Sequence, residues 1–227
     1  MTKNYKEIYD QSIKNKEDFW KKISDDIFWY SKPTKILNTD NPPFYRWFQD
    51  GITNTCYNAL DFHIDNALGD KIALIWDSPI TNSKATYTFS QLREKVALFA
   101  GALKDQGATK GDRIIIYMPM IPEAVIAMLA SARIGAIHSV VFGGFASNEL
   151  ANRIDDSKAK IIISASCGYE PGRTVEYKPL LDKAIEIAKH KPEKCIIFQR
   201  KDFKANLDSK LDVDWEEILK KSKPAEC

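Results

Sequence analysis

The stretch that decides the fold is IHSVVFGGFASNELANRIDDSKAKIIISASCGYEPGRTVEYK, residues 137–178. Its first residues are apolar and rich in β-branched side chains, which predicts a strand that ends at the glycine pair 143–144. Ser147 is expected to cap a helix that runs to about Ser157, and the apolar run 161–163 predicts a second strand covered on both faces. Strand, helix and strand in this order predict a βαβ unit of a parallel sheet.

The second turn of this stretch, CGYEPGR at 167–173, carries one arginine. Pro171 and Gly172 predict a tight bend that holds the side chain of Arg173 outward, where a guanidinium group could grip two oxygens of a phosphate. Because ligands of open parallel sheets bind at the carboxyl ends of the strands, both turns are expected on one ligand-binding edge, with Lys178 within reach of it. Taken alone, each is more commonly a plain turn or an exposed arginine, so only their combination favours an anion site.

Composition and charge exclude several classes of protein. Lys plus Arg number 33 and Asp plus Glu number 31, and the charges are interleaved, so no basic stripe favours a nucleic acid partner. Residues 1–11 lack the apolar core of a secretory signal, and no apolar run of the sequence reaches membrane-spanning length. The 4 cysteines are scattered without a CxxC pair, which favours thiols in a reducing compartment over a zinc site. A cytoplasmic location is therefore expected.

The chain is expected to contain two regions. Residues 1–64 would form a helical and aromatic-rich irregular arm, because Pro42 and Pro43 prevent a helix across that point. Stacking of these aromatic rings on nucleic acid bases is the less favoured alternative, since no basic groove accompanies them. Residues 65–227 would form an α/β region. Strands and helices alternate over 113–199, which predicts a doubly wound, mostly parallel sheet with flanking helices.

Individual elements follow from local signals. Strands are expected at 71–77, 84–89, 113–118 and 194–198. Four helices are also expected: one capped by Ser90, one that begins at Pro122, one near Leu180 and one near Trp215. Residues 200–213 lack periodicity and predict a surface linker, while Lys189 and His190 are expected in the last turn of a helix. His138 lies in an apolar strand pattern, which favours a core histidine over a catalytic one.

Sequence motifs of several enzyme classes are absent from the chain. There is no GxxxxGK[ST] phosphate loop, no GxGxxG dinucleotide fingerprint, no GxSxG elbow and no HExxH. The 3 histidines are far apart in sequence, and nothing pairs a nucleophile with a base. We therefore predict no catalytic residue and no metal ligand in this chain. The missing GxGxxG also argues against an oxidoreductase on a Rossmann sheet.

Several long segments resemble one known family. Residues 132–154, ARIGAIHSVVFGGFASNELANRI, strongly resemble the acetyl-CoA synthetase group of acyl-adenylate-forming ligases, and so do residues 87–130 and 44–64. The segment ASCGYEPGRTVEYKPLLDKAI, 165–185, is similar to the propionate-CoA ligase branch. Acetate-specific members usually carry a further arginine in this turn, before the Gly-Arg pair, at the place where this chain has Glu170 and Pro171. The resemblance therefore favours propionate over acetate.

The resemblance implies a fold and a reaction. The chain would be part of the N-terminal domain of an adenylate-forming, AMP-binding enzyme. Propionate, or alternatively acetate, would react with ATP to give an acyl-adenylate and diphosphate, and CoA would then displace AMP, with Mg²⁺ neutralising phosphate charge. The implied partners are these small molecules, with no nucleic acid and no membrane.

The resemblance also implies which residues would bind CoA. They are Glu170, Pro171, Gly172 and Arg173, with the arginine near the 3′-phosphate, and Gly144, close to the CoA entry. The ATP site and the catalytic lysine of the family lie beyond this segment, so the 227-residue chain alone is expected to be inactive. The alternative of another class is a non-catalytic CoA- or nucleotide-binding module. Finding the phosphate loop in the continuing reading frame would decide for the enzyme.

Overall fold

A computed structural model of the chain describes residues 4–143 and 146–227. They divide into two compact units, Met1–Asn54 and Thr55–Cys227, which are presented separately below. The division expected after residue 64 falls inside the short helix α3, Phe62–Asp65. Among the described residues, no helix combines the length and the apolar character that a membrane crossing requires.

The first unit holds short elements and many aromatic side chains. Its elements are α1 (Tyr5–Lys14), α2 (Lys16–Ile23), the 3₁₀ turn η1 (Ser24–Asp26), and the antiparallel strands β1 (Leu37–Asn38) and β2 (Arg46–Trp47). The rings contact one another within the unit: Trp20 and Trp47 lie 6.2 Å apart between centroids, and Trp29 and Phe48 lie 5.7 Å apart. Packing among rings therefore organises a segment that is poor in regular structure.

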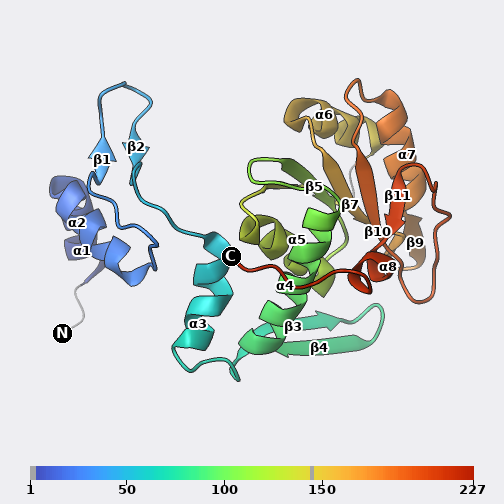
Figure 1. The fold of residues 1–227 in the computed structure, drawn as a ribbon, viewed down its shortest axis with the longest axis horizontal. Helices are drawn as coiled ribbons and strands as arrows, with labels where there is room; N and C mark the ends of the chain where they lie inside the picture. Colours follow the sequence, from blue (N-terminus) through green and yellow to red (C-terminus); the bar gives the residue numbers. More distant parts are fainter. Residues whose placement is uncertain (1–3, 144–145) are drawn as a thin grey trace. The chain divides into compact units, whose positions relative to one another are not determined.

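The second unit is built on a five-stranded parallel sheet (Figure 1). Its strand order is β11 (Asp212–Asp214), β10 (Lys194–Phe198), β7 (Ile161–Ala165), β5 (Arg113–Tyr117) and β6 (Ile137–Val140). Every neighbouring pair in this order is parallel. The predicted parallel α/β sheet is confirmed.

Helices cover both faces of this sheet. One apolar core lies beneath α4 (Phe89–Asp105), α5 (Pro122–Arg133) and α8 (Trp215–Leu219). A second core lies beneath α6 (Ser147–Ser157) and α7 (Tyr177–Ile187). The doubly wound arrangement therefore has a separate core on each side of the strands.

Strand β5 shows why the sequence specifies this arrangement. Ile114 and Ile116 belong to the core beneath α4 and α5, whereas Ile115 and Tyr117 belong to the core beneath α6 and α7. Successive side chains of a strand point to opposite faces, so a strand covered on both faces must be apolar throughout. The run RIIIY meets that requirement, and its last four residues are fully buried.

Further elements surround the sheet. They are the π-helical turn η2 (Tyr57–Asp61), α3, the antiparallel hairpin β3 (Ile72–Ser78) and β4 (Ser83–Thr88), and the antiparallel hairpin β8 (Cys167–Glu170) and β9 (Arg173–Glu176). The residues that follow α8 lie against α4, where the amide of Ala225 donates to the carbonyl of Ala97 at 2.9 Å. This contact fixes the end of the described chain on the helical layer.

Two expected helix caps are wrong. Helix α4 is capped by Thr88 rather than Ser90: the amide of Gln91 donates to the Thr88 hydroxyl at 3.2 Å, and the Thr88 amide donates to the Gln91 side chain at 3.0 Å. These reciprocal bonds form a capping box, whose T-x-x-Q signature is present in the sequence. Helix α6 has Ala146 as its N-cap, and the hydroxyl of Ser147 instead donates to the carbonyl of Leu180.

Three further expectations need correction. Helix α7 ends at Ile187, so Lys189 and His190 lie beyond it, and the ring of His190 contacts the carbonyl of Ala159 at 2.9 Å. His138 is exposed rather than buried, because β6 lies at the edge of the described sheet. Residues 200–213 are not only a linker, since they contain the start of β11.

Candidate functional site

A cavity of about 600 Å³ opens at the carboxyl edge of the sheet. Each of four strands contributes a lining residue just after it ends: Pro119 after β5, Gly143 after β6, Gly168 after β7 and Arg200 after β10. The β3–β4 hairpin forms another wall. Open parallel sheets bind ligands at this edge because the loops there diverge and leave a crevice. The two predicted turns therefore do meet at one edge.

Two glycines of the cavity approach the same buried ring. A Cβ atom on Gly143 would lie 2.1 Å from the hydroxyl oxygen of Tyr177, and one on Gly168 would lie 2.9 Å from it. The Tyr177 ring also stacks on Tyr117, with 4.9 Å between centroids. Burial raises the pKa of Tyr177, so the phenol stays neutral in the ordinary pH range. Gly144, the other glycine of the predicted pair, lies outside the described residues.

The second predicted turn is a β-hairpin rather than an irregular loop. Strand β8 pairs with β9 so that Glu170 stands opposite Arg173, and Pro171 with Gly172 connects the two strands. Gly172 has φ of +77°, a conformation that glycine adopts without a steric penalty. The bend predicted at Pro171–Gly172 is thus present, with strands in place of the loop residues around it.

Arg173 points outward, as its position after the bend predicts, but its guanidinium group already has an anionic partner. Its side chain is 71% exposed, and its Nη2 lies 2.6 Å from Oε2 of Glu170. Both residues line a second cavity of about 450 Å³, and Glu170 also lines the larger one. An exposed ion pair is worth at most about 1 kcal/mol. A doubly charged phosphate could therefore compete with Glu170 for the arginine.

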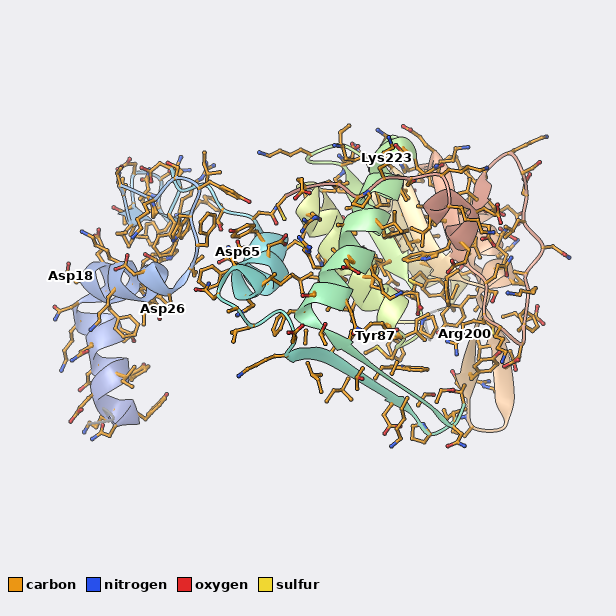
Figure 2. The ribbon with its side chains drawn as sticks, turned by 60° about the horizontal axis from the view of Figure 1, so that its bottom comes forward. Asp18, Asp26, Asp65, Tyr87, Arg200 and Lys223 are labelled. Atoms are coloured by element: carbon orange, nitrogen blue, oxygen red, sulfur yellow. The ribbon has the colours of Figure 1, made fainter. Side chains whose placement is uncertain are left out.

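Arg200 is a second cation of the site, which the sequence interpretation did not single out. Its guanidinium carbon lies 4.9 Å from the centroid of the Tyr169 ring, a cation–π distance, and the side chain lines the larger cavity. Figure 2 labels the Arg200 side chain. Its position two residues after the apolar strand 194–198 was the available signal, because residues that follow a parallel strand lie on the ligand edge. The site therefore presents two arginines to a ligand.

Lys178 does not reach this edge, although its place in the sequence predicts that it should. Its side chain is buried, with Nζ 2.8 Å from Oδ2 of Asp212 and paired also with Asp182. Burial opposes its charge, but the two carboxylates raise the pKa of Lys178 above its usual value. Lys178 therefore connects α7 to β11 instead of facing a ligand.

Comparison with known families identifies two matching regions. Residues 63–226 match the family described as AMP-binding enzyme, and residues 5–59 match the family described as acetyl-coenzyme A synthetase N-terminus. The first match alone spans most of the second unit. It bears out the resemblance on which the expected fold depends.

Similar proteins are longer than this chain. Acyl-CoA synthetase short-chain family member 3, mitochondrial, of Rattus norvegicus is 50% identical over 98% of this chain and 33% of its own length. Propionate--CoA ligase of Escherichia coli (strain K12) is 45% identical over 93% of this chain and 34% of its own length. The chain thus spans about a third of the length of these curated relatives. The rat protein's name places it in mitochondria, whereas the cytoplasmic location expected here stays a prediction.

A solved structure shows the same fold. The acetoacetyl-CoA synthetase from Streptomyces lividans matches with a TM-score of 0.86 at 21% identity, over 100% of this chain and 34% of that one. At this identity the likeness concerns the fold alone. It agrees with the parallel sheet and flanking helices described above.

Proposed function

Since the chain belongs to the family of AMP-binding enzymes, we propose that it forms part of a short-chain acyl-CoA ligase. In the proposed reaction a carboxylate oxygen attacks the α-phosphorus of ATP, which releases diphosphate and leaves an acyl-adenylate. The CoA thiol then loses its proton to a base, and its sulfur attacks the acyl carbonyl carbon. The bond between the acyl carbon and the AMP oxygen breaks, and AMP departs. The observation that carries the proposal is the family match over residues 63–226.

Propionate is the proposed acyl substrate. The support is the pair Glu170 and Pro171, which stands where acetate-specific relatives are expected to have an arginine, together with 45% identity to a protein named propionate--CoA ligase. The complete protein should release diphosphate from ATP in the presence of CoA, with a higher kcat/KM for propionate than for acetate. A preference for acetate would overturn the substrate assignment. CoA binding without diphosphate release would instead favour a non-catalytic module.

The β8–β9 hairpin is the proposed docking place for the nucleotide end of CoA. Arg173 would contact the 3′-phosphate by exchanging its bond to Glu170 for bonds to phosphate oxygens. Pro171 and Gly172 would present the bend to the ligand. Gly143, in the turn after β6, and Gly144, which lies outside the described residues, would be close to the CoA entry. Mg²⁺ enters the proposal with ATP, and we assign no ligand to it among the described residues.

Arg173→Ala should weaken CoA binding by about 1.5–3 kcal/mol, because a hydrogen bond to a charged group is worth that much. Dephospho-CoA lacks the 3′-phosphate, so its affinity should change little. Isothermal titration of the complete protein with both ligands measures the difference. An equal loss for CoA and dephospho-CoA would remove the 3′-phosphate assignment.

Two further variants make this test specific. Lys183 is also an exposed cation in an ion pair, with Glu186, but it lies on α7 away from both cavities. Lys183→Ala should therefore leave both affinities unchanged. The resemblance implies that Glu170 contacts CoA, whereas its ion pair with Arg173 makes its carboxylate a competitor of the phosphate. If competition is the larger effect, Glu170→Gln should tighten CoA binding by up to about 1 kcal/mol. A weaker affinity in Glu170→Gln would mean that the carboxylate itself contacts the ligand.

A further inference from the structure

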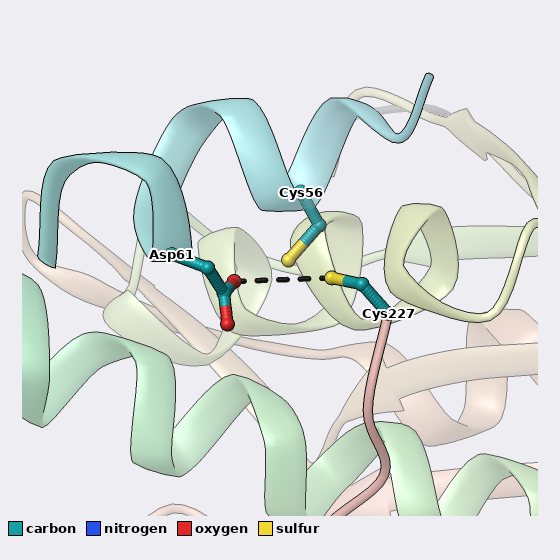
Figure 3. Close-up of side chains that lie close together, drawn as sticks. All are labelled: Cys56, Asp61 and Cys227. Carbon is teal, nitrogen blue, oxygen red and sulfur yellow. Dashed lines mark hydrogen bonds between the residues drawn. The ribbon is translucent and has the colours of Figure 1, made fainter. Parts of the chain in front are cut away.

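Two cysteines far apart in the sequence lie side by side in the second unit. Cys56 precedes η2, and Cys227 ends the segment that packs on α4 (Figure 3). Their sulfur atoms and a carboxylate oxygen of Asp61 all lie within 4.8 Å of one another. The sulfur of Cys227 also lies 3.8 Å from Oδ2 of Asp61. The arrangement brings two thiols within reach of each other in a chain where the four cysteines carry thiols and not disulfides.

Arg133 gives this cluster a buried positive charge. Its Nη1 lies 3.6 Å from the sulfur of Cys56 and 2.7 Å from Oδ2 of Asp61, and its Nη2 lies 3.1 Å from Oδ1. Both carboxylate oxygens of Asp61 therefore accept from the guanidinium group. A divalent cation would have to displace that bidentate pair and tolerate the adjacent charge, which makes the cluster a poor metal site.

The same charge favours a thiolate. The hydrogen bond from the Cys227 thiol, together with Arg133, holds the pKa of Cys56 below its usual value despite burial. The hydrogen bond to Cys56 raises the pKa of Cys227. A thiolate beside a cation is the reactive form of cysteine. Its neighbouring thiol then stands in the position of a resolving group.

The pair is accessible from one side. Cys56 is fully buried, whereas Cys227 is exposed. A cavity of about 340 Å³ is lined by Arg133, Glu226 and Cys227, and so approaches the pair from solvent. A small oxidant that enters this cavity would reach Cys227 first, and its access to Cys56 requires a local movement of the segment that carries Cys227.

We propose that Cys56 and Cys227 form a redox-active dithiol, which a peroxide or a low-molecular-weight disulfide converts into an intramolecular disulfide. With hydrogen peroxide, the Cys56 thiolate attacks one oxygen, and the O–O bond breaks to give a sulfenic acid and, after protonation, water. The Cys227 sulfur then attacks the sulfenic sulfur and expels a second water. Both thiols lose their hydrogens, and the two electrons reduce the peroxide.

The disulfide would tie the beginning of the second unit to the segment that follows α8. A cross-link over so long a stretch of chain restricts the unfolded state. The oxidised protein should therefore melt at a higher temperature than the reduced one, and dithiothreitol should reverse the shift.

Peptide mapping under non-reducing conditions tests the proposal. After treatment of the protein with hydrogen peroxide, or separately with oxidised glutathione, a tryptic peptide containing Cys56 should be joined to one containing Cys227, with the loss of two alkylatable thiols. Cys167 and Cys195 are internal controls, since both are fully buried and burial raises the pKa of Cys195. Both should remain alkylatable after denaturation of the treated sample.

Cys227→Ala is the matched variant, because the side chain is exposed and its removal leaves the core intact. It should lose both the cross-linked peptide and the oxidation-dependent rise in melting temperature. Failure to recover the 56–227 peptide from the unmodified protein, or linkage of Cys56 to another cysteine, would overturn the proposal. Protection of both thiols from alkylation by Zn²⁺ alone, at stoichiometric metal, would also overturn it and assign a metal site.

Discussion

Arg133→Met should lower the free energy of unfolding of the second unit by about 3–5 kcal/mol, the usual cost of leaving one partner of a buried ion pair without the other. The side chain of Arg133 is 1% exposed and forms two hydrogen bonds with Asp61, at 2.7 and 3.1 Å. Its Nε also donates to the carbonyl of Ala225 at 2.6 Å. The substitution would leave a buried carboxylate and a buried carbonyl without this donor.

Urea denaturation followed by circular dichroism measures this effect. Lys189→Met, at an exposed lysine that follows α7, is the control and should change stability by no more than about 0.5 kcal/mol. The double variant Arg133→Met, Asp61→Leu leaves neither charge buried alone, so it should be more stable than the single variant. A double variant as unstable as the single one would show that the ion pair is not the source of the loss.

Lys178→Met should also destabilise the second unit by about 3–5 kcal/mol, because it removes the cation that faces two carboxylates. The side chain of Asp212 is 1% exposed, and its Oδ2 lies 2.8 Å from Nζ of Lys178. Loss of the lysine would leave this buried charge with the amide of Asp208 as its remaining described donor. Strand β11 should therefore detach more readily from β10.

Two measurements separate this structural role from a role in ligand binding. Urea denaturation should show the loss of stability, and hydrogen exchange should show faster exchange in residues 212–214. Titration of the complete protein at a temperature where the variant is folded should give an unchanged CoA affinity. Lys183→Met, on the same helix but exposed, is the control. Weaker CoA binding by fully folded Lys178→Met would show that Lys178 contributes to ligand binding as well as to stability.

The sheet could be predicted from the sequence wherever a strand was apolar on both faces. The runs at 113–117, 161–165 and 194–198 are such strands, and the structure has each of them. Strand β11 was not predictable in this way, because DVD has one apolar residue between two acids. Its place in the sheet depends on pairing with β10 and on the charge of Lys178, which are contacts between distant parts of the chain.

The candidate site was predictable in position but not in detail. The rule that ligands bind at the carboxyl ends of parallel strands correctly brought the two turns to one edge. It could not show that Arg173 pairs with Glu170, because that contact depends on the register of the β8–β9 hairpin. It could equally have pointed to Arg200, whose position after a strand was overlooked. The roles of these residues toward CoA stay predictions.

Tyr177 gives the two walls of the cavity a common spacer. Its ring occupies the space that side chains at Gly143 and Gly168 would need, so the width between the loop after β6 and the start of β8 is set by one aromatic group. Any bulkier residue at either glycine would push this ring against Tyr117 and spread the walls apart. Because Tyr177 contacts both walls, a ligand that moved one of them would also move the other. The two walls of the cavity should therefore move together when its opening widens or narrows.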